Sequence, residues 1–266
     1  MHGATRAGHV LAIGLLAGIA SWPGATAAPR MDDREALRFS QAAIGRTVGG
    51  YEFTSSAGAR LTLEQLRGRP VVLSLVYTSC YHVCSGLTLR LRETVKVAQD
   101  ALGEGSFAVV TVGFDTPNDT PERMRQYAHE RGANLADWHF ASTDAETLGR
   151  LARDVGFTYF ASTKGFDHIT QTTIIDGAGR VVLQVYGEDF APPLVVEPLK
   201  KLVWGGNLDR GTLEGLVNTV KLFCTIYDPS SGRYRFDYSL IVNILAGGLA
   251  LGIAAAGILA ALRNVR

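Results

Sequence analysis

The stretch that decides the fold is Val71-Val72-Leu73-Ser74-Leu75-Val76-Tyr77-Thr78-Ser79-Cys80-Tyr81-His82-Val83-Cys84. Its first half is rich in Val and Leu and follows the turn residues Gly68-Arg69-Pro70, which predicts a short buried strand. From Leu87 to Ala98 the apolar residues approximate one face of a helix. Cys80 and Cys84 therefore lie where a strand ends and a helix begins. We expect this position to expose both thiols, and the helix amides to favour thiolate over thiol.

Strands and helices alternate over the rest of the chain as far as Trp204. Thr120 precedes Pro121 as a helix cap, and Gly177-Ala178-Gly179 separates two apolar runs as a turn. The predicted order from the opening strand is β-α-β-α-β-α-β-β-α, which indicates an α/β fold with a mixed sheet and flanking helices. The further strands are predicted at 106–114, 138–140, 172–176 and 180–186, and the further helices at 120–131, 144–155 and 195–204.

Both ends of the chain indicate export and a membrane anchor. Residues 1–27 have a basic head, a short apolar run and an Ala-x-Ala site, which are the parts of a signal peptide cleaved after Ala27. Residues 238–262 carry no charge and match the length of a transmembrane helix. The sequence thus predicts an exported domain at 28–204, a linker at 205–237 and a transmembrane helix at 238–262. The C-terminus would be cytoplasmic, and the domain would face a bacterial periplasm.

The overall charge points away from nucleic acid, because the formal net charge of the 266 residues is only +1. An oxidising compartment matters for the cysteines, since a close pair there becomes a disulfide unless a reductant or a metal keeps it open.

Three chemistries suit Cys80 and Cys84: a structural pair, a redox pair of the thioredoxin type, or a soft-metal site for Cu(I) or Zn. Thioredoxin itself has two residues between its cysteines, whereas this chain has three. A metal site with two sulfurs usually needs a third ligand. His168 is the best placed, because it lies in a predicted loop just before the strand at 172–176, whereas His129 and His139 lie in a charged helix and a packed strand.

Three motifs together resemble the Sco/SenC family over roughly residues 45 to 205: Thr78-x-Cys80-x-x-x-Cys84, Asp115 with Asp119-Thr120-Pro121-Glu122, and Asp167-His168 before a strand. The members of that family are membrane-tethered, thioredoxin-fold copper proteins that serve assembly of the copper centre of cytochrome c oxidase. The resemblance implies a thioredoxin-like fold, copper ligation by Cys80, Cys84 and His168, and delivery to the copper-binding subunit of the oxidase. Asp167 would orient His168 or tune the charge of the site.

The chain departs from the family pattern in its loop and in its anchor. Tyr81 and Ser85 stand where the family usually has proline, and His82 could be an extra ligand. The predicted span lies at the C-terminus, whereas the family is most often anchored at the N-terminus. Cys224 is left over, as a free thiol, a docked linker cysteine or an intermolecular partner. The alternative function is a thiol-disulfide oxidoreductase that keeps oxidase cysteines reduced and uses Cys80 and Cys84 without His168.

Overall fold

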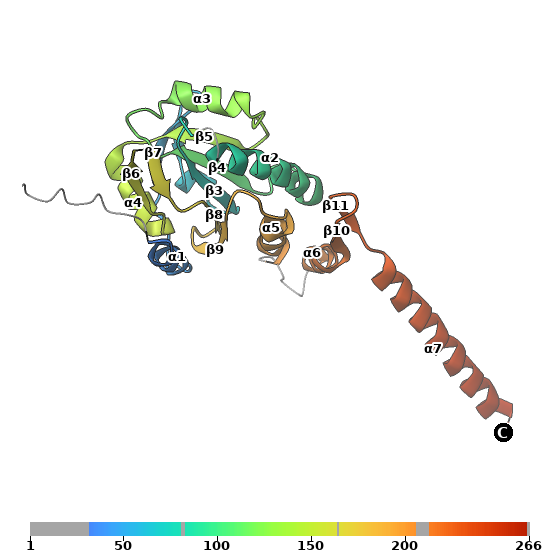
Figure 1. Ribbon diagram of the computed structural model, residues 1–266. Coiled ribbons are helices and arrows are strands. Elements are labelled where there is room, and N and C mark those ends of the chain that lie inside the picture. The colour runs from blue at the N-terminus through green and yellow to red at the C-terminus, as the bar shows by residue number, and fades with distance from the viewer. Residues whose placement is uncertain (1–31, 81–82, 164, 206–212, 265–266) are drawn as a thin grey trace, which may run out of the picture.

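The computed structural model describes residues 32–80, 83–163, 165–205 and 213–264 (Figure 1). The predicted signal peptide and the residues Tyr81 and His82 lie outside these ranges. The helices are α1 (Asp33–Gln41), the 3-10 turn η1 (Glu64–Leu66), α2 (Val83–Leu102), α3 (Pro121–Glu130), α4 (Ala145–Val155), α5 (Pro193–Gly205), α6 (Leu213–Cys224) and α7 (Ser239–Asn264). The strands are β1 (Glu52–Ser55), β2 (Arg60–Thr62), β3 (Val71–Val76), β4 (Ala108–Gly113), β5 (Trp138–Ser142), β6 (Tyr159–Ser162), β7 (Gly165–His168), β8 (Gln171–Ile175), β9 (Val181–Tyr186), β10 (Thr225–Asp228) and β11 (Arg233–Phe236).

The centre of the domain is a seven-stranded mixed sheet in the order β2-β1-β5-β4-β3-β8-β9. β3 pairs in parallel with β4 and antiparallel with β8, so the strand that leads to Cys80 lies inside the sheet. All six residues of β3 and of β4 are buried, as expected of strands with a covered face on each side. The predicted mixed sheet and its buried opening strand are therefore confirmed.

Helices cover both faces of the sheet (Figure 1). α2, α3 and α5 lie on one face, where Tyr127 of α3 donates to or accepts from Thr88 of α2 at 2.8 Å. α1 and α4 lie on the other, and Gly156, the left-handed C-cap of α4, faces the backbone of Ser40 in α1. The predicted cap of α3 is also confirmed, because the Thr120 hydroxyl accepts the Arg123 amide and Pro121 is the first helical residue.

Residues 213–264, beyond α5, form helices and a hairpin. α6 leads into the β10–β11 hairpin, whose residue Tyr234 packs against the hydrophobic core, and α7 follows. Cys224 at the end of α6 is 2% exposed, so the third cysteine is buried. Over the ranges that the structure describes, none of the helices is both long enough and apolar enough to cross a membrane.

Candidate metal and thiol site

Cys80 and Cys84 lie on the two sides of the junction between β3 and α2. Two polar contacts fix the loop at its start, where the Asp119 carboxylate accepts the Thr78 amide at 2.8 Å and the Thr78 hydroxyl at 2.7 Å. The first turn of α2 is fixed from α3, because the Tyr127 hydroxyl donates to the Cys84 carbonyl at 2.8 Å. Both cysteines are thus carried on anchored backbone, and the residues between them are Tyr81, His82 and Val83.

The sulfur of Cys80 accepts a hydrogen bond from the Cys84 amide at 3.4 Å. This contact is of the predicted kind, between a cysteine sulfur and a backbone amide at the start of a helix. The predicted exposure, however, is wrong. Cys80 is 8% exposed and Cys84 only 1%, because the β6–β7 hairpin and its aromatic side chains lie over the junction. Cys80 and Cys84 are not joined by a disulfide.

The sulfurs differ in their electrostatic surroundings. The hydrogen bond to Cys80 and then burial raise the pKa of the Cys84 thiol above its usual value. Cys84 therefore keeps its proton beside the Cys80 sulfur, so the expectation that the helix amides favour the thiolate is wrong for Cys84. Cys80 is also the more exposed of the two, so it is the sulfur that an external thiol, disulfide or metal ion would reach first.

His168 is the last residue of β7, whereas the sequence predicted a loop at this position. The hairpin brings its Nε2 atom to 3.9 Å from the Cys84 sulfur, in the first turn of α2. Its Nδ1 atom lies 3.2 Å from the Ile169 carbonyl, which can only accept a hydrogen bond. Nδ1 therefore carries the proton, and the lone pair of Nε2 points toward the Cys84 sulfur. A metal-ligating histidine needs this arrangement.

Asp167 does not make that hydrogen bond. It alternates with His168 along β7 and is exposed, so its side chain lies on the opposite face of the hairpin. Its carboxylate acts on the imidazole only through its charge, which opposes the fall in the pKa of His168. The predicted orienting role belongs to the Ile169 carbonyl instead.

An aromatic cluster surrounds the imidazole. The rings of Tyr77, Phe114 and Phe157 lie 5.9, 5.3 and 6.0 Å from that of His168 between centroids. Burial in this cluster lowers the pKa of His168, so the ring stays neutral near pH 7 and retains a lone pair for a metal. Sequence reasoning missed these three residues. An aromatic residue at the end of each buried strand, Tyr77 after β3 and Phe114 after β4, was the available signal.

The residues fit a soft metal ion in part. With bonds of the length known for zinc, a sulfur and an imidazole nitrogen on one three-coordinate ion lie about 3.8 Å apart. The observed 3.9 Å between Cys84 Sγ and His168 Nε2 agrees with this separation. Within the described part of the chain, no three His, Cys, Asp or Glu side chains are already gathered as a metal site. The Cys80 side chain would therefore have to turn toward the other two.

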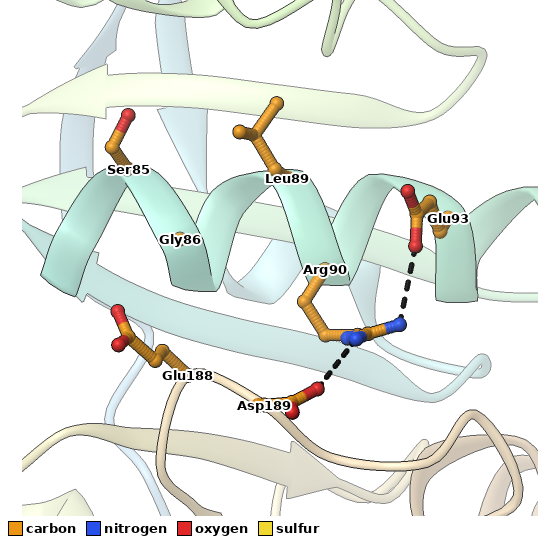
Figure 2. Close-up of a pocket in the computed structure, with 7 residues that line it drawn as sticks. All are labelled: Ser85, Gly86, Leu89, Arg90, Glu93, Glu188 and Asp189. Atoms are coloured by element: carbon orange, nitrogen blue, oxygen red, sulfur yellow. Dashed lines mark hydrogen bonds and ion pairs between the residues drawn. The ribbon is translucent and has the colours of Figure 1, made fainter. Parts of the chain in front are cut away.

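A charged groove of about 540 Å³ runs beside α2, starting at the residue after Cys84 (Figure 2). Arg90 crosses it and pairs with Glu93 at 3.2 Å and with Asp189 at 2.5 Å. The groove contributes no sulfur or imidazole, and its arginine is neutralised internally. Its lining residues are Ser85, Gly86, Leu89, Arg90, Glu93, Glu188 and Asp189.

The mixed sheet and the thiol-bearing junction between β3 and α2 define a thioredoxin-like domain with a Cys-x-x-x-Cys pair and a histidine from a hairpin. The sequence signature of the SCO1/SenC family matches residues 40–203. The chain belongs to this family. A search among curated proteins found no significant match.

Solved structures share the fold. A SCO1/SenC family lipoprotein from Bacillus anthracis is 19% identical, with a TM-score of 0.55, over 59% of this chain and 95% of its own. Copper-bound ScoI of Arabidopsis thaliana is 18% identical, with a TM-score of 0.50, over 59% and 95%. BsSco, a member of the Sco family of cytochrome c oxidase assembly proteins in which a disulfide switch was identified, is 15% identical, with a TM-score of 0.53, over 60% and 94%. At such identities these likenesses establish the fold alone.

Proposed function

We propose that this protein is a membrane-tethered copper chaperone that delivers copper to the copper centre of a cytochrome c oxidase during assembly. The observation that carries the proposal is the pair formed by Cys84 Sγ and His168 Nε2 at 3.9 Å, beside the second sulfur of Cys80. Two sulfurs and a neutral imidazole are soft and intermediate donors that suit Cu(I), and Cu(II) with a further ligand. Family membership and the copper-bound ScoI fold support the same cargo.

Transfer would proceed by exchange of ligands with the copper-binding subunit of the oxidase. Cys80, the more exposed sulfur, would release copper first to a partner thiolate, and Cys84 and His168 would follow. The pair has to be reduced for this, since a disulfide sulfur no longer offers a thiolate. BsSco shares this fold and is a member of a family of cytochrome c oxidase assembly proteins, which supports an oxidase as the partner.

Tethering would come from the C-terminal segment. The run 238–262 carries no charge, and the described side chains of α7 include exposed apolar residues such as Val242, Leu249 and Ile253. With cleavage after Ala27, the domain would lie in the periplasm, a single span in the inner membrane and the C-terminus in the cytoplasm. A chain ending at Asp237 should then leave the membrane fraction, and its retention there would argue against the tether.

The experiment that tests the copper site is a titration of the reduced full chain with copper, comparing His168→Ala with His129→Ala. His129 is exposed on α3, so His129→Ala is a matched control that removes an imidazole away from the site. We expect one copper per chain and a Cu(II)-thiolate charge-transfer band in the parent and in His129→Ala. His168→Ala should weaken copper binding by roughly 100-fold. Loss of a residue that only hydrogen-bonds a metal ligand already costs about 10- to 100-fold in affinity, and loss of the ligand itself should cost at least as much. Equal affinity in both variants would exclude the three-ligand site.

A second function, thiol-disulfide exchange that keeps oxidase cysteines reduced, is favoured by the asymmetry of the thiols. Cys84 has a raised pKa, whereas Cys80 accepts hydrogen bonds and is the more exposed. Exchange of this kind needs Cys80 and Cys84 but not His168. A His168→Ala variant that lost copper but still reduced a disulfide at the parent's rate would show that the pair supports both activities.

A further inference from the structure

Arg131, the C-cap of α3, lies against the turn of α2 that carries Cys84. Its Nε atom donates to the Ser85 hydroxyl at 3.0 Å, and its Nη1 atom donates to the Tyr127 carbonyl at 3.3 Å. Its guanidinium carbon lies 3.6 Å from the centre of the Tyr127 ring, and Glu130 supplies a counter-charge at 3.4 Å. The side chain is only 10% exposed. These partners offset the cost of burying a charged group.

Tyr127 and Arg131 bond to consecutive residues of α2. The Tyr127 hydroxyl donates to the Cys84 carbonyl at 2.8 Å, and Arg131 bonds to the next residue, Ser85. In Figure 2 the Ser85 side chain points away from Glu188, so its hydroxyl is directed to the other flank of α2. Because the Arg131 guanidinium also lies on the Tyr127 ring, the two contacts depend on one another. The end of α3 therefore holds the start of α2 through this Tyr127–Arg131 pair.

The first turn of α2 needs contacts of this kind. The first amides of a helix have no acceptor within the helix, and the Cys84 amide bonds instead to the Cys80 sulfur at 3.4 Å. That contact would be lost if the Cys80 side chain turned toward a metal ion. The Tyr127–Arg131 pair does not involve the Cys80 side chain, so it holds the turn with or without the metal.

The other ligand is held from a different element. The Ile169 carbonyl fixes the His168 ring on the β7 side, at 3.2 Å from its Nδ1 atom. The distance of 3.9 Å between Cys84 Sγ and His168 Nε2 therefore depends on two supports, one from the hairpin and one from the end of α3.

We propose that Arg131 is a positioning residue of this site, which holds the turn that carries Cys84 at its observed distance from His168. In the metal-free protein it keeps Cys84 buried. For copper it fixes one ligand before the ion arrives, and loss of such support costs about 10- to 100-fold in metal affinity. The copper readout rests on the proposed function, whereas the thiol readout does not.

The metal-free test measures how fast iodoacetamide alkylates Cys84 in the reduced full chain. Cys84 is 1% exposed, so it reacts only when its turn opens. The variants are Arg131→Met, which keeps an apolar stem of similar length, and Ser85→Ala, which removes only the acceptor. Arg92→Met is the matched control, because Arg92 also joins α2 to α3, through the Arg131 carbonyl at 2.8 Å, but about two turns further along α2. Cys224, which is 2% exposed at the end of α6, reports opening elsewhere in the same molecule.

We expect Arg131→Met and Ser85→Ala each to speed the alkylation of Cys84 about tenfold, the effect of losing one hydrogen bond to a charged group. The double variant should react no faster than Arg131→Met, because effects that act through one contact do not add. Arg92→Met should alkylate Cys84 at the parent rate, and Cys224 should react at the parent rate in every variant. Fragment masses assign the label to each cysteine. Parent rates at Cys84 in both Arg131→Met and Ser85→Ala, or an equal acceleration in Arg92→Met, would overturn the role of Arg131.

Copper titration of the same reduced proteins tests the link to the metal site. Arg131→Met and Ser85→Ala should bind copper about tenfold more weakly than the parent, and Arg92→Met should bind it equally well. Parent-like copper affinity in both site variants would overturn the metal part of the proposal. A parent that binds no copper refutes the proposed function instead, and the alkylation rates still decide the role of Arg131.

Discussion

The contact between Asp119 and the loop before Cys80 allows a stability prediction from the structure. Asp119 is 1% exposed, and its carboxylate accepts three hydrogen bonds: the Thr78 amide at 2.8 Å, the Thr78 hydroxyl at 2.7 Å and the Asp115 amide at 2.9 Å. Asp119→Ala leaves all three donors without this acceptor. At about 1 kcal/mol for each partly buried donor, the free energy of unfolding should fall by about 3 kcal/mol.

Thr78→Val is the matched control, because it removes one of the three bonds and keeps the side-chain shape. Its expected cost is about 1 kcal/mol, a third of that for Asp119→Ala. Urea unfolding followed by tryptophan fluorescence measures both values on the same chain. The equilibrium between the dithiol and the disulfide of Cys80 and Cys84, measured against reduced and oxidised glutathione, should also shift more in Asp119→Ala than in Thr78→Val. The reason is that the Asp119 carboxylate holds the start of the loop. Equal costs for the two variants, or less than about 1 kcal/mol for Asp119→Ala, would refute the view that the carboxylate organises the loop.

Two further predictions concern residues away from the site. Burial lowers the pKa of His139, and the charge of Asp137 opposes this, so the folded chain binds the proton less readily than the unfolded chain. The contribution of His139 to stability is therefore present above pH 6.5 and lost as the pH falls below it. Thermal unfolding across this range should show a smaller loss of stability in His139→Gln than in the parent, and an unchanged pH dependence in this variant would contradict the assignment. Gly156→Ala should cost about 3 kcal/mol and Gly45→Ala only about 1 kcal/mol. Both glycines have positive φ, but a Cβ at Gly156 would lie 2.7 Å from the Ser40 Cα, whereas at Gly45 no atom lies within 4 Å, and similar unfolding midpoints would exclude this steric argument.

The sequence sufficed for elements whose signals are local. β3 was predicted from its Val/Leu run, α3 from its cap at Thr120, and α4 as a helix over 144–155. The β6–β7 hairpin was missed because each of its strands has only four residues and neither shows a clear alternation of apolar and polar residues. That omission produced the wrong expectation of exposed thiols, since this hairpin lies over the cysteines.

For the site, the sequence indicated which residues could meet but not how they would meet. Cys84 and His168 are 84 positions apart, and their approach depends on the pairing of β6 with β7 and on the aromatic rings beneath. The proton on Nδ1 of His168 depends on the direction of the Ile169 carbonyl, a property of the folded backbone. The identity of a ligand can therefore be suggested by residue type and spacing, whereas its tautomer and its protonation state come from tertiary contacts.

The β10–β11 hairpin before α7 is also held in place by tertiary contacts. Lys200 of α5 is 5% exposed, and burying an ammonium group is costly unless it is paired. Its Nζ atom donates to the Thr225 carbonyl at 2.6 Å, pairs with Glu197 at 3.0 Å and lies 5.6 Å from the centre of the Tyr234 ring. Two of these partners belong to the β10–β11 hairpin. The charge can remain buried only while the hairpin is docked, so the distance from the thiol site to α7 is set by packing as well as by the length of the chain.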